Sequence, residues 1–383
     1  MTQLFWLFAF VVIYVYFGYP LLLKLRLLGT STEWLRGEAK PLISVIVAAH
    51  NEESVIEAKL KNLLSSDYPR ECVEVLIGSD GSSDSTEAIV RKFTADGVGL
   101  ISFPQHQGKS AIQNGLVAKA SGSILVFTDA DCTLSPEALS CLVQNFADDK
   151  IGLVTGIPRF ENIQETSMAR NEGTYLRYET WLRTRESDYG LLAMASGSLF
   201  AMRRCLWKPL DPNVGDDFAL PLHVALMGRR TVLDSRVVAS TRLTQSHAHS
   251  MFNLKVRIVS KDLRALLANR RILNPFRYGA IAISLWSHKL LRWLVPYFLM
   301  ALFALNIFLS HTPFYRAVLL FQIIFYATAL LGFLPRDNKI AHPLSIPMSF
   351  CVVNFASLIG TAKCLIGHKS GRWKPIRKQP HAV

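Results

Sequence analysis

Acidic side chains follow directly after three apolar segments of the chain. Glu52 follows the first segment, Asp80 follows the second, and Asp129 and Asp131 follow the third. Carboxylate oxygens are the ligands that hard divalent cations such as Mg²⁺ and Mn²⁺ prefer. Such a cation can hold a diphosphate near carboxylates that would otherwise repel it, and it can take up charge on a departing diphosphate. The clusters therefore favour a metal-dependent reaction of a phosphorylated ligand, although a single Asp-x-Asp is also found in ordinary turns.

Strand and helix patterns alternate between residues 42 and 150 and predict how these clusters come together. Apolar, β-branched runs predict buried parallel strands, and apolar residues at helical spacing predict the helices between them. The expected strands are 42–49, 73–77, 98–103 and 123–128, and the expected helices are 51–66, 84–93, 109–120 and 135–146. This alternation is typical of an α/β protein with a doubly wound sheet, which binds ligands beyond the carboxyl ends of its strands. We therefore expect the acidic clusters to share one edge of the sheet.

Two common nucleotide-binding loops are missing from the sequence. No G-x-G-x-x-G segment follows the first expected strand, and no Walker A segment is present. These loops hold the phosphates of dinucleotide cofactors and of nucleoside triphosphates, respectively. The sequence therefore argues against a dinucleotide-dependent enzyme and against a P-loop NTPase.

The composition is unusual for a soluble protein. Of 383 residues, 50% are hydrophobic and 19% are charged, and the mean hydropathy is +0.24, whereas a soluble domain has about 25% charged residues. The net charge is +13, but residues 42–250 carry 20 basic and 25 acidic side chains, and residues 251–383 carry 18 basic and 2 acidic. The basic excess therefore lies outside the acidic middle domain. We expect it to contact anionic lipid headgroups, and we expect no nucleic-acid partner.

Four apolar segments are long enough to cross a bilayer, which takes about 20 helical residues. They are residues 3–23, 290–309, 317–334 and 343–366. A cleaved signal peptide is the alternative for the first segment, but it lacks a basic start and a small-residue cleavage site. A buried soluble core is the alternative for the other three. Their near-consecutive order favours membrane segments.

The distribution of basic residues predicts the orientation in the membrane. Lys24, Arg26, Arg36 and Lys40 follow the first segment, so the N-terminus should be outside and the middle domain cytoplasmic. The tail carries five more basic residues and also belongs inside, but a spanning segment at 343–366 would place it outside. Pro343, Pro347 and Lys363 lie in that segment, so we expect it to be irregular, re-entrant or interfacial.

Four motifs in order resemble those of family 2 glycosyltransferases with the GT-A fold: AAHNEE, GSDGSSDST, Gln107-Gly108-Lys109 and FTDAD. The membrane-embedded group, which includes cellulose, chitin and hyaluronan synthases, also has flanking membrane helices. The resemblance implies inverting transfer from a nucleotide sugar. It implies contacts to the base and ribose from Ala48, Glu52 and Asp80, to the phosphates from Lys109, to the nucleotide from Asp129, and to the metal from Asp131 together with Asp129. His50 stands in the same base pocket, where the family commonly has Tyr.

The resemblance also assigns residues to the acceptor side. Asp217 falls where the family has its general base, and Asp216 replaces the usual Glu beside it. A carboxylate is required there to accept the proton of the attacking hydroxyl group. The same pair can instead cap the expected helix that runs to Met227, and the two roles are compatible. The segment Ser196-Gly197-Ser198 lies where relatives shape the acceptor site.

One motif departs from the processive synthases of this family. They carry Q-x-x-R-W, whose Trp packs under the growing sugar chain, but Leu254 and Ile258 replace the Gln and the Trp here. Arg257 is retained and could face the diphosphate. Residues 251–271 otherwise have the pattern of a basic amphipathic helix at a membrane interface, for which a solvated helix packed on the domain is the alternative.

The sequence thus predicts a GT-A domain of the α/β class flanked by transmembrane helices. The expected division is a transmembrane helix at 1–24, a basic linker at 25–41, a cytoplasmic catalytic domain at 42–250, interfacial helices at 251–289, about three membrane segments at 290–366 and a basic tail at 367–383. The expected activity is transfer from a nucleotide sugar, with a UDP-sugar as the first choice, to a lipid-linked or membrane-delivered glycan acceptor at the cytoplasmic face of the cell membrane. The alternatives are a processive polysaccharide synthase that translocates its product and a non-enzymatic scaffold with a decayed domain.

Overall fold

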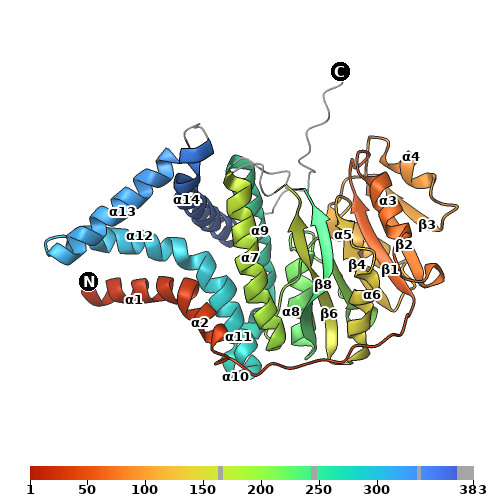
Figure 1. Cartoon of the computed structure of the whole chain (residues 1–383), viewed down its shortest axis with the longest axis horizontal. Coiled ribbons are helices and arrows are strands. Elements are labelled where there is room, and N and C mark those ends of the chain that lie inside the picture. Colours follow the sequence, from red (N-terminus) through yellow and green to blue (C-terminus); the bar gives the residue numbers. More distant parts are fainter. Residues whose placement is uncertain (163–166, 243–247, 334–337, 369–383) are drawn as a thin grey trace, which may run out of the picture.

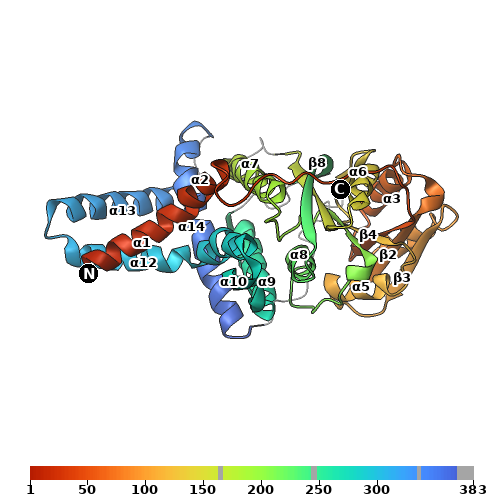
Figure 2. The same ribbon diagram turned by 90° about the horizontal axis from the view of Figure 1, so that it is seen from below.

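The computed structural model describes residues 1–162, 167–242, 248–333 and 338–368. An α/β domain forms one end of the molecule, and the helices α1, α12 and α13 project together from the other end (Figure 1). The helices α7, α9 and α14 lie between these two parts (Figures 1 and 2). The basic tail, with the exception of its first two residues, lies outside the described residues.

The domain is built on an eight-stranded sheet with the strand order β3-β2-β1-β4-β7-β6-β8-β5. Its strands are β1 (Ile43–Ala49), β2 (Val73–Asp80), β3 (Val98–Phe103), β4 (Ile124–Thr128), β5 (Thr133–Leu134), β6 (Ile151–Phe160), β7 (Leu199–Arg203) and β8 (Arg230–Thr241). The first four strands are parallel, as the sequence predicts. Strand β7 runs antiparallel to both β4 and β6, so the sheet is mixed.

Alternate residues of the central strands feed two apolar cores on opposite faces of the sheet. On β1, Ile46 packs with Ile112 and Leu116 on one face, while Val45 packs with Leu60 of the other face. A strand that is buried on both faces requires the continuous apolar run that the sequence shows. The helices of the domain are α3 (Ile56–Leu64), α4 (Thr86–Arg91), α5 (Lys109–Val117), α6 (Ala138–Gln144) and α8 (Asp216–Leu226).

Three helices begin later than their sequence patterns predict. The helix expected from residue 51 begins at Ile56, because Asn51 has a φ of 54° and cannot continue a right-handed helix. The helix expected from residue 84 begins at Thr86, whose backbone N–H donates to Asp84 Oδ1 at 3.0 Å. The helix expected from residue 135 begins at Ala138. In each case the first residues of the expected helix remain a loop.

Within the described residues, four helices are long and apolar enough to cross a membrane: Thr2–Lys24, Ala280–Leu309, Pro313–Leu331 and Leu344–Leu365. They comprise α1 (Thr2–Ile13) with η1 (Tyr14–Gly18) and α2 (Tyr19–Lys24), α11 (Ala280–Ser284) with η6 (Leu285–Leu290) and α12 (Leu291–Leu309), then α13 (Pro313–Leu331) and most of α14 (Asn338–Leu365). These helices support association with a membrane.

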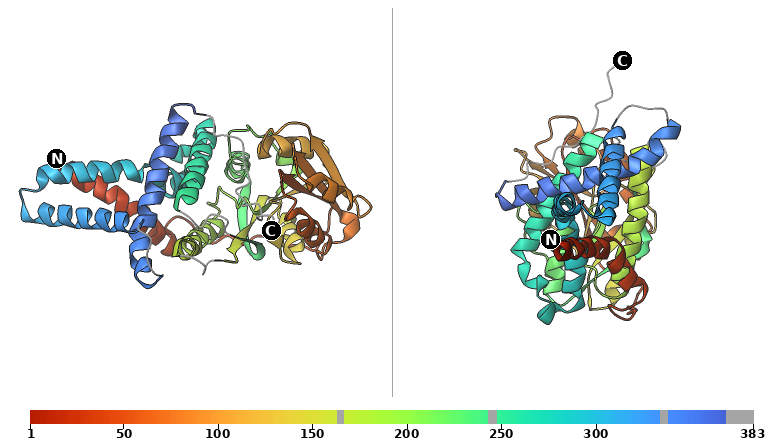
Figure 3. Two further views of the ribbon diagram at one scale, coloured as in Figure 1. Left: turned by 90° about the horizontal axis from the view of Figure 1, so that it is seen from above. Right: turned by 90° about the vertical axis from the view of Figure 1, so that its left-hand side faces the viewer.

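The last of these helices has a different direction from the others. Helices α1, α12 and α13 lie roughly side by side, whereas α14 crosses them and lies beside α9 (Ala248–Ala268) (Figures 2 and 3). In its most apolar stretch, 44% is buried inside the protein, whereas the buried share in the other three helices is 6–28%. Gly360 allows the close approach of α14 to α9, because a Cβ there would lie 2.9 Å from Val259 Cβ. Helix α14 therefore packs as part of the protein body.

Candidate active site

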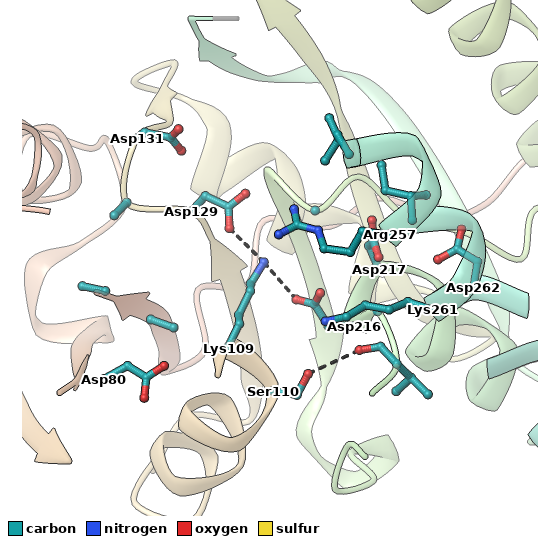
Figure 4. Close-up of a pocket in the computed structure, with 18 of the residues that line it drawn as sticks. Asp80, Lys109, Ser110, Asp129, Asp131, Asp216, Asp217, Arg257, Lys261 and Asp262 are labelled. Atoms are coloured by element: carbon teal, nitrogen blue, oxygen red, sulfur yellow. Dashed lines mark hydrogen bonds and ion pairs between the residues drawn. The ribbon is translucent and has the colours of Figure 1, made fainter. Parts of the chain in front are cut away.

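The carboxyl ends of β1, β2 and β4 open on a cavity of about 270 Å³, which the N-terminal ends of α5 and α8 and one face of α9 close (Figure 4). Most of the residues proposed from the sequence line it. They are Ala48, Glu52, Asp80, Lys109, Asp129, Asp131, Gly197, Asp216, Asp217 and Arg257. Sheet topology brings these side chains together, since strands that are parallel end at one edge.

Lys109 is the cation at the centre of the cavity. Helix α5 begins at this residue, directly after Gly108, whose φ of 95° allows the sharp turn from the preceding loop. Lys109 Nζ lies 2.8 Å from Asp129 Oδ1 and 3.2 Å from Asp216 Oδ2 (Figure 4). Burial alone lowers the pKa of Lys109, but Asp129 and Asp216 reverse this and raise it. The ammonium group therefore stays charged and faces the edge where a diphosphate would bind.

The two carboxylates at the start of α8 differ in their surroundings. Asp216 is buried and accepts a hydrogen bond from Gln113 Nε2 at 2.6 Å, and Lys109 and this hydrogen bond outweigh its burial and lower its pKa. Removal from water raises the pKa of Asp217 to about 6, and repulsion by Asp216 adds to this shift. Asp216 is thus held as a fixed anion, while Asp217 is able to exchange a proton near neutral pH. Burial also raises the pKa of Asp262, which lines the same cavity, to about 7.

Glycines leave room for Asp217 on both sides. A Cβ at Gly215 would lie 2.9 Å from Asp217 Oδ1 and 3.4 Å from Asp262 Oδ1. A Cβ at Gly197 would lie 3.4 Å from Asp217 Oδ2. The carboxylate of Asp217 thus lines the cavity in a space that side chains at Gly197 or Gly215 would fill. This space lets the carboxylate approach a substrate.

The pKa of Asp217 predicts the pH dependence of any reaction in which this residue accepts a proton. The carboxylate must be ionised to act as a base, so the rate should fall as the pH drops through about 6. Well below that pH, kcat/KM should decrease about tenfold per pH unit. The measurement is a pH–rate profile between pH 5 and 8 at saturating metal. A profile that is flat across pH 6 would contradict the assignment of Asp217 as the base.

The loop after β4 fits a divalent cation. Donor atoms of Asp129, Asp131 and Cys132 lie within 4.8 Å of one another. Burial, followed by repulsion from Asp129 and Asp131, raises the pKa of Cys132 to about 12, so this residue remains a thiol and is a poor ligand. The two carboxylates are hard oxygen donors suited to Mg²⁺ or Mn²⁺.

A buried lysine supports this loop from behind. Lys59 Nζ donates to the carbonyl oxygen of Cys132 at 2.7 Å and to Thr128 Oγ1 at 2.9 Å. Burial lowers its pKa to about 8, and the nearby carboxylates oppose this shift. The helical pattern of residues 51–66 does not indicate that Lys59 reaches under the end of β4, so this residue could not be selected from the sequence.

Asp80 is held by backbone groups of the loop before α5. Its carboxylate accepts hydrogen bonds from Gln107 N at 2.6 Å and Gly108 N at 2.8 Å. His50, expected in the base pocket, does not line the cavity: its Nδ1 lies 2.7 Å from the Asp80 carbonyl oxygen, and its ring stacks on His106 at 4.1 Å. The imidazole lies beside the pocket because it is short enough to pack against this loop.

The remaining sequence proposals fall at the edge of the cavity or on α9. Ser196 and Ser198 flank Gly197 but do not line the cavity, because their backbone groups pair with Thr155 and Thr128. Arg257 projects from α9 towards the cavity (Figure 4). Lys261 and Asp262 of the same helix also line the cavity. They could not be selected from the sequence, because only the packing of α9 brings them near α8.

Comparison with known proteins agrees with this arrangement. Residues 44–208 match the model of the family "Glycosyl transferase family 2". Among curated relatives, the chain is 31% identical over 203 residues to the probable glycosyltransferase YdaM of Bacillus subtilis, covering 49% of this chain and 47% of the relative. It is 28% identical to the beta-monoglucosyldiacylglycerol synthase of Trichormus variabilis, covering 49% and 42% respectively. The chain thus matches less than half the length of these relatives.

One solved structure resembles almost the whole chain. It is the mannosyltransferase PcManGT from Pyrobaculum calidifontis, in complex with GDP-Man and Mn²⁺. The TM-score is 0.70 at 22% identity, and the match covers 94% of this chain and 99% of that one. The predicted fold, a GT-A domain flanked by apolar helices, is confirmed.

Proposed function

Because residues 44–208 form a glycosyl transferase family 2 domain, we propose that this chain transfers a sugar from a nucleotide sugar to an acceptor in the membrane, with inversion at the anomeric carbon. The observation that carries the proposal is the arrangement around one cavity of a metal-type Asp pair, a charged Lys109 and a proton-accepting Asp217. A decayed domain without catalysis would have no reason to retain all three.

The reaction follows from the positions of these groups. The acceptor hydroxyl oxygen attacks the anomeric carbon from the side of Asp217, which takes the hydroxyl proton. The bond between the anomeric carbon and the diphosphate oxygen breaks, and the diphosphate leaves with the electron pair through an oxocarbenium-like transition state. Lys109 lies between Asp129 and Asp216, and its charge would stabilise the leaving diphosphate.

Asp129 and Asp131 would hold the divalent cation. The cation supplies a positive charge that neutralises the diphosphate as it leaves. Lys109 Nζ lies 2.8 Å from Asp129 Oδ1, so Asp129 would be shared between the cation and Lys109, while Asp131 would be a ligand of the cation alone. Asp80, Glu52 and Ala48 line the part of the cavity where the base and ribose would bind, and Arg257 lies near the diphosphate.

The donor and acceptor classes rest on the relatives as well as on the cavity. A UDP-sugar remains our first choice of donor, with a GDP-sugar as the alternative because the PcManGT structure contains GDP-Man. The glucosyldiacylglycerol synthase favours a lipid acceptor. Replacement of the processive Gln and Trp by Leu254 and Ile258 favours a single addition over polymerisation, although the poly-beta-1,6-N-acetyl-D-glucosamine synthase of Staphylococcus aureus is 32% identical over 122 residues.

The test is donor turnover by the full chain in detergent. A panel of UDP- and GDP-sugars is offered with Mg²⁺ or Mn²⁺, and release of the nucleoside diphosphate is followed. We expect one donor to be consumed and the product to carry one or two added sugars. A ladder of long products would instead support the processive alternative, and no consumption of any donor would contradict the enzyme assignment.

Because α14 crosses the direction of α1, α12 and α13, we propose that it does not span the membrane with them. If α1, α12 and α13 cross the membrane and α14 lies at the cytoplasmic interface, the catalytic domain and the basic tail are on the same side. This arrangement agrees with the basic residues that follow Lys24 and with those of the tail. The proposal is therefore a protein of the cell membrane with three spans.

The topology predicts the location of the C-terminus. A reporter fused after Val383 should be cytoplasmic, like a reporter inserted in the catalytic domain, and a fusion in the loop between α12 and α13 should be external. Paired fluorescence and alkaline phosphatase fusions measure this. An external reporter after Val383 would show that α14 spans the membrane.

A further inference from the structure

A second cavity of about 330 Å³ lies between α7 (Ser167–Asp188), α9, the start of α12 and α14. It shares Ile258 and Asp262 with the catalytic cavity, so the two adjoin along one face of α9. Tyr16 of the N-terminal helix and Trp293 of α12 also line it, which places it where the membrane helices meet the catalytic domain. A molecule reaching Asp217 from the membrane would occupy this position.

The charged side chains of the second cavity balance one another. Its lining contains the cations Lys255, Lys289 and Arg292 and the carboxylates Glu172, Glu179 and Asp262. Lys255 Nζ lies 2.7 Å from Glu172 Oε1, and Arg292 Nη1 lies 3.1 Å from Glu179 Oε2.

His288 extends this pairing, since Nε2 lies 3.0 Å from Glu179 Oε1 and Nδ1 lies 2.7 Å from Glu186 Oε1. A phosphate that paired with Lys255, Arg292 or His288 would have to break such a pair, and a buried carboxylate that loses its cation is strongly destabilised.

The uncharged lining consists of hydroxyl, amide and aromatic groups. The polar lining residues are Asn171, Ser349, Asn354 and Ser357. Asn171 Nδ2 donates to Ser349 Oγ at 3.0 Å, and the donors of Asn354 and Ser357 bond to carbonyl oxygens of α14, so these groups offer a ligand mainly their acceptor oxygens. Trp293, Tyr16 and Phe350 supply apolar ring surface. Aromatic faces with a few placed polar groups are what a compact ligand with both hydroxyl groups and apolar surface needs. The cavity volume is far larger than the share of about 30 Å³ that one water molecule occupies.

We propose that this second cavity binds the neutral, hydroxyl-bearing headgroup of a membrane lipid and directs its reacting hydroxyl past Asp262 to Asp217. This inference rests on the proposed glycosyltransferase function and specifies its acceptor. The lipid tail leaves between the membrane helices, while the headgroup binds among balanced charges. Polyprenyl phosphates, which carry an anionic reacting group, are poor acceptors by this account.

A substitution that fills the cavity tests the proposal. Ser349 lines the cavity from α14 and is partly exposed, so Ser349→Trp places a ring in the space of the headgroup. Ile346 lies on the same helix, is 57% exposed and does not line the cavity, which makes Ile346→Trp the matched control. We expect Ser349→Trp to lower transfer to a diacylglycerol bearing one hexose at least about tenfold, and Ile346→Trp to transfer at the wild-type rate.

Lipid binding is measured separately by native mass spectrometry of the full chain in detergent. The hexosyl-diacylglycerol should be retained by the wild type and by Ile346→Trp, and lost by Ser349→Trp. Retention of the neutral lipid by Ser349→Trp, or preferential binding of polyprenyl phosphate displaced by the same substitution, would overturn the proposal whether or not any donor turns over. Absence of donor turnover with normal lipid binding would contradict the proposed function alone.

Discussion

The substitution Asp217→Asn is expected to lower the rate of sugar transfer by about a thousandfold. The amide has nearly the same shape as the carboxylate but cannot accept the hydroxyl proton, and general base catalysis contributes about 10²–10⁴-fold to rates. The loss should appear in kcat, because Asp217 acts on the acceptor and not on the nucleotide. Donor affinity, measured by calorimetry, should change little.

A matched control separates catalysis from folding in this experiment. Asp149 carries a carboxylate that is 94% exposed at its side chain and does not line the catalytic cavity, so Asp149→Asn should transfer sugar at the wild-type rate. Both variants should show the same melting temperature to within a few degrees. If Asp217→Asn retains wild-type transfer, another group accepts the proton and the proposed role of this residue is wrong.

The substitution Asp131→Asn should weaken the binding of the divalent cation. The structure offers two carboxylates to the metal, and loss of one leaves Asp129, whose charge is shared with Lys109. Mutation of groups that only hydrogen-bond to metal ligands lowers metal affinity about 10–100-fold. Removal of a ligand itself should therefore weaken the apparent affinity for Mn²⁺ by about a hundredfold or more. Titration of activity with Mn²⁺ and with Mg²⁺ measures this.

Glu137 provides the comparison for Asp131. It is an exposed acidic residue a few positions further along the chain, between β5 and α6, and it does not line the cavity. Glu137→Gln should leave the metal titration unchanged. Equal metal titrations for Asp131→Asn and the wild type would place the cation elsewhere, and activity that persists in excess chelator would show that no cation is needed.

Local patterns were sufficient to predict the first half of the domain. The segments ending at Ala49, Asp80 and Thr128 are apolar because helices cover both faces of the sheet, so their buried strands and the acidic loops after them could be found without any tertiary information. The loops meet at one edge because the strands are parallel, which a doubly wound sheet requires.

The second half of the domain could not be predicted in this way. Helix α7 is largely polar, since it buries a network of charges around Glu179 and Glu186 instead of an apolar stripe. Strands β6, β7 and β8 complete the sheet in mixed directions, which a repeated strand–helix pattern does not reveal. The second cavity depends on how α7, α9 and α14 pack together.

Two predictions depended on details of packing. His50 was expected in the base pocket but stacks on His106, because the loop that carries His106 folds over Asp80. The segment at 343–366 was expected to be irregular or interfacial. It belongs to the continuous helix α14, and its direction across α12 and α13 supports the interfacial alternative.

We propose that Asp217, by accepting the hydroxyl proton, enables transfer of a sugar from a nucleotide sugar to a membrane lipid. The direct measurement incubates the full chain in vesicles with each radiolabelled UDP- and GDP-sugar and Mn²⁺, and counts the label in the lipid extract. We predict label from one donor with the wild type, and about a thousandfold less with Asp217→Asn. No label from any donor, or equal label from both proteins, would contradict this account.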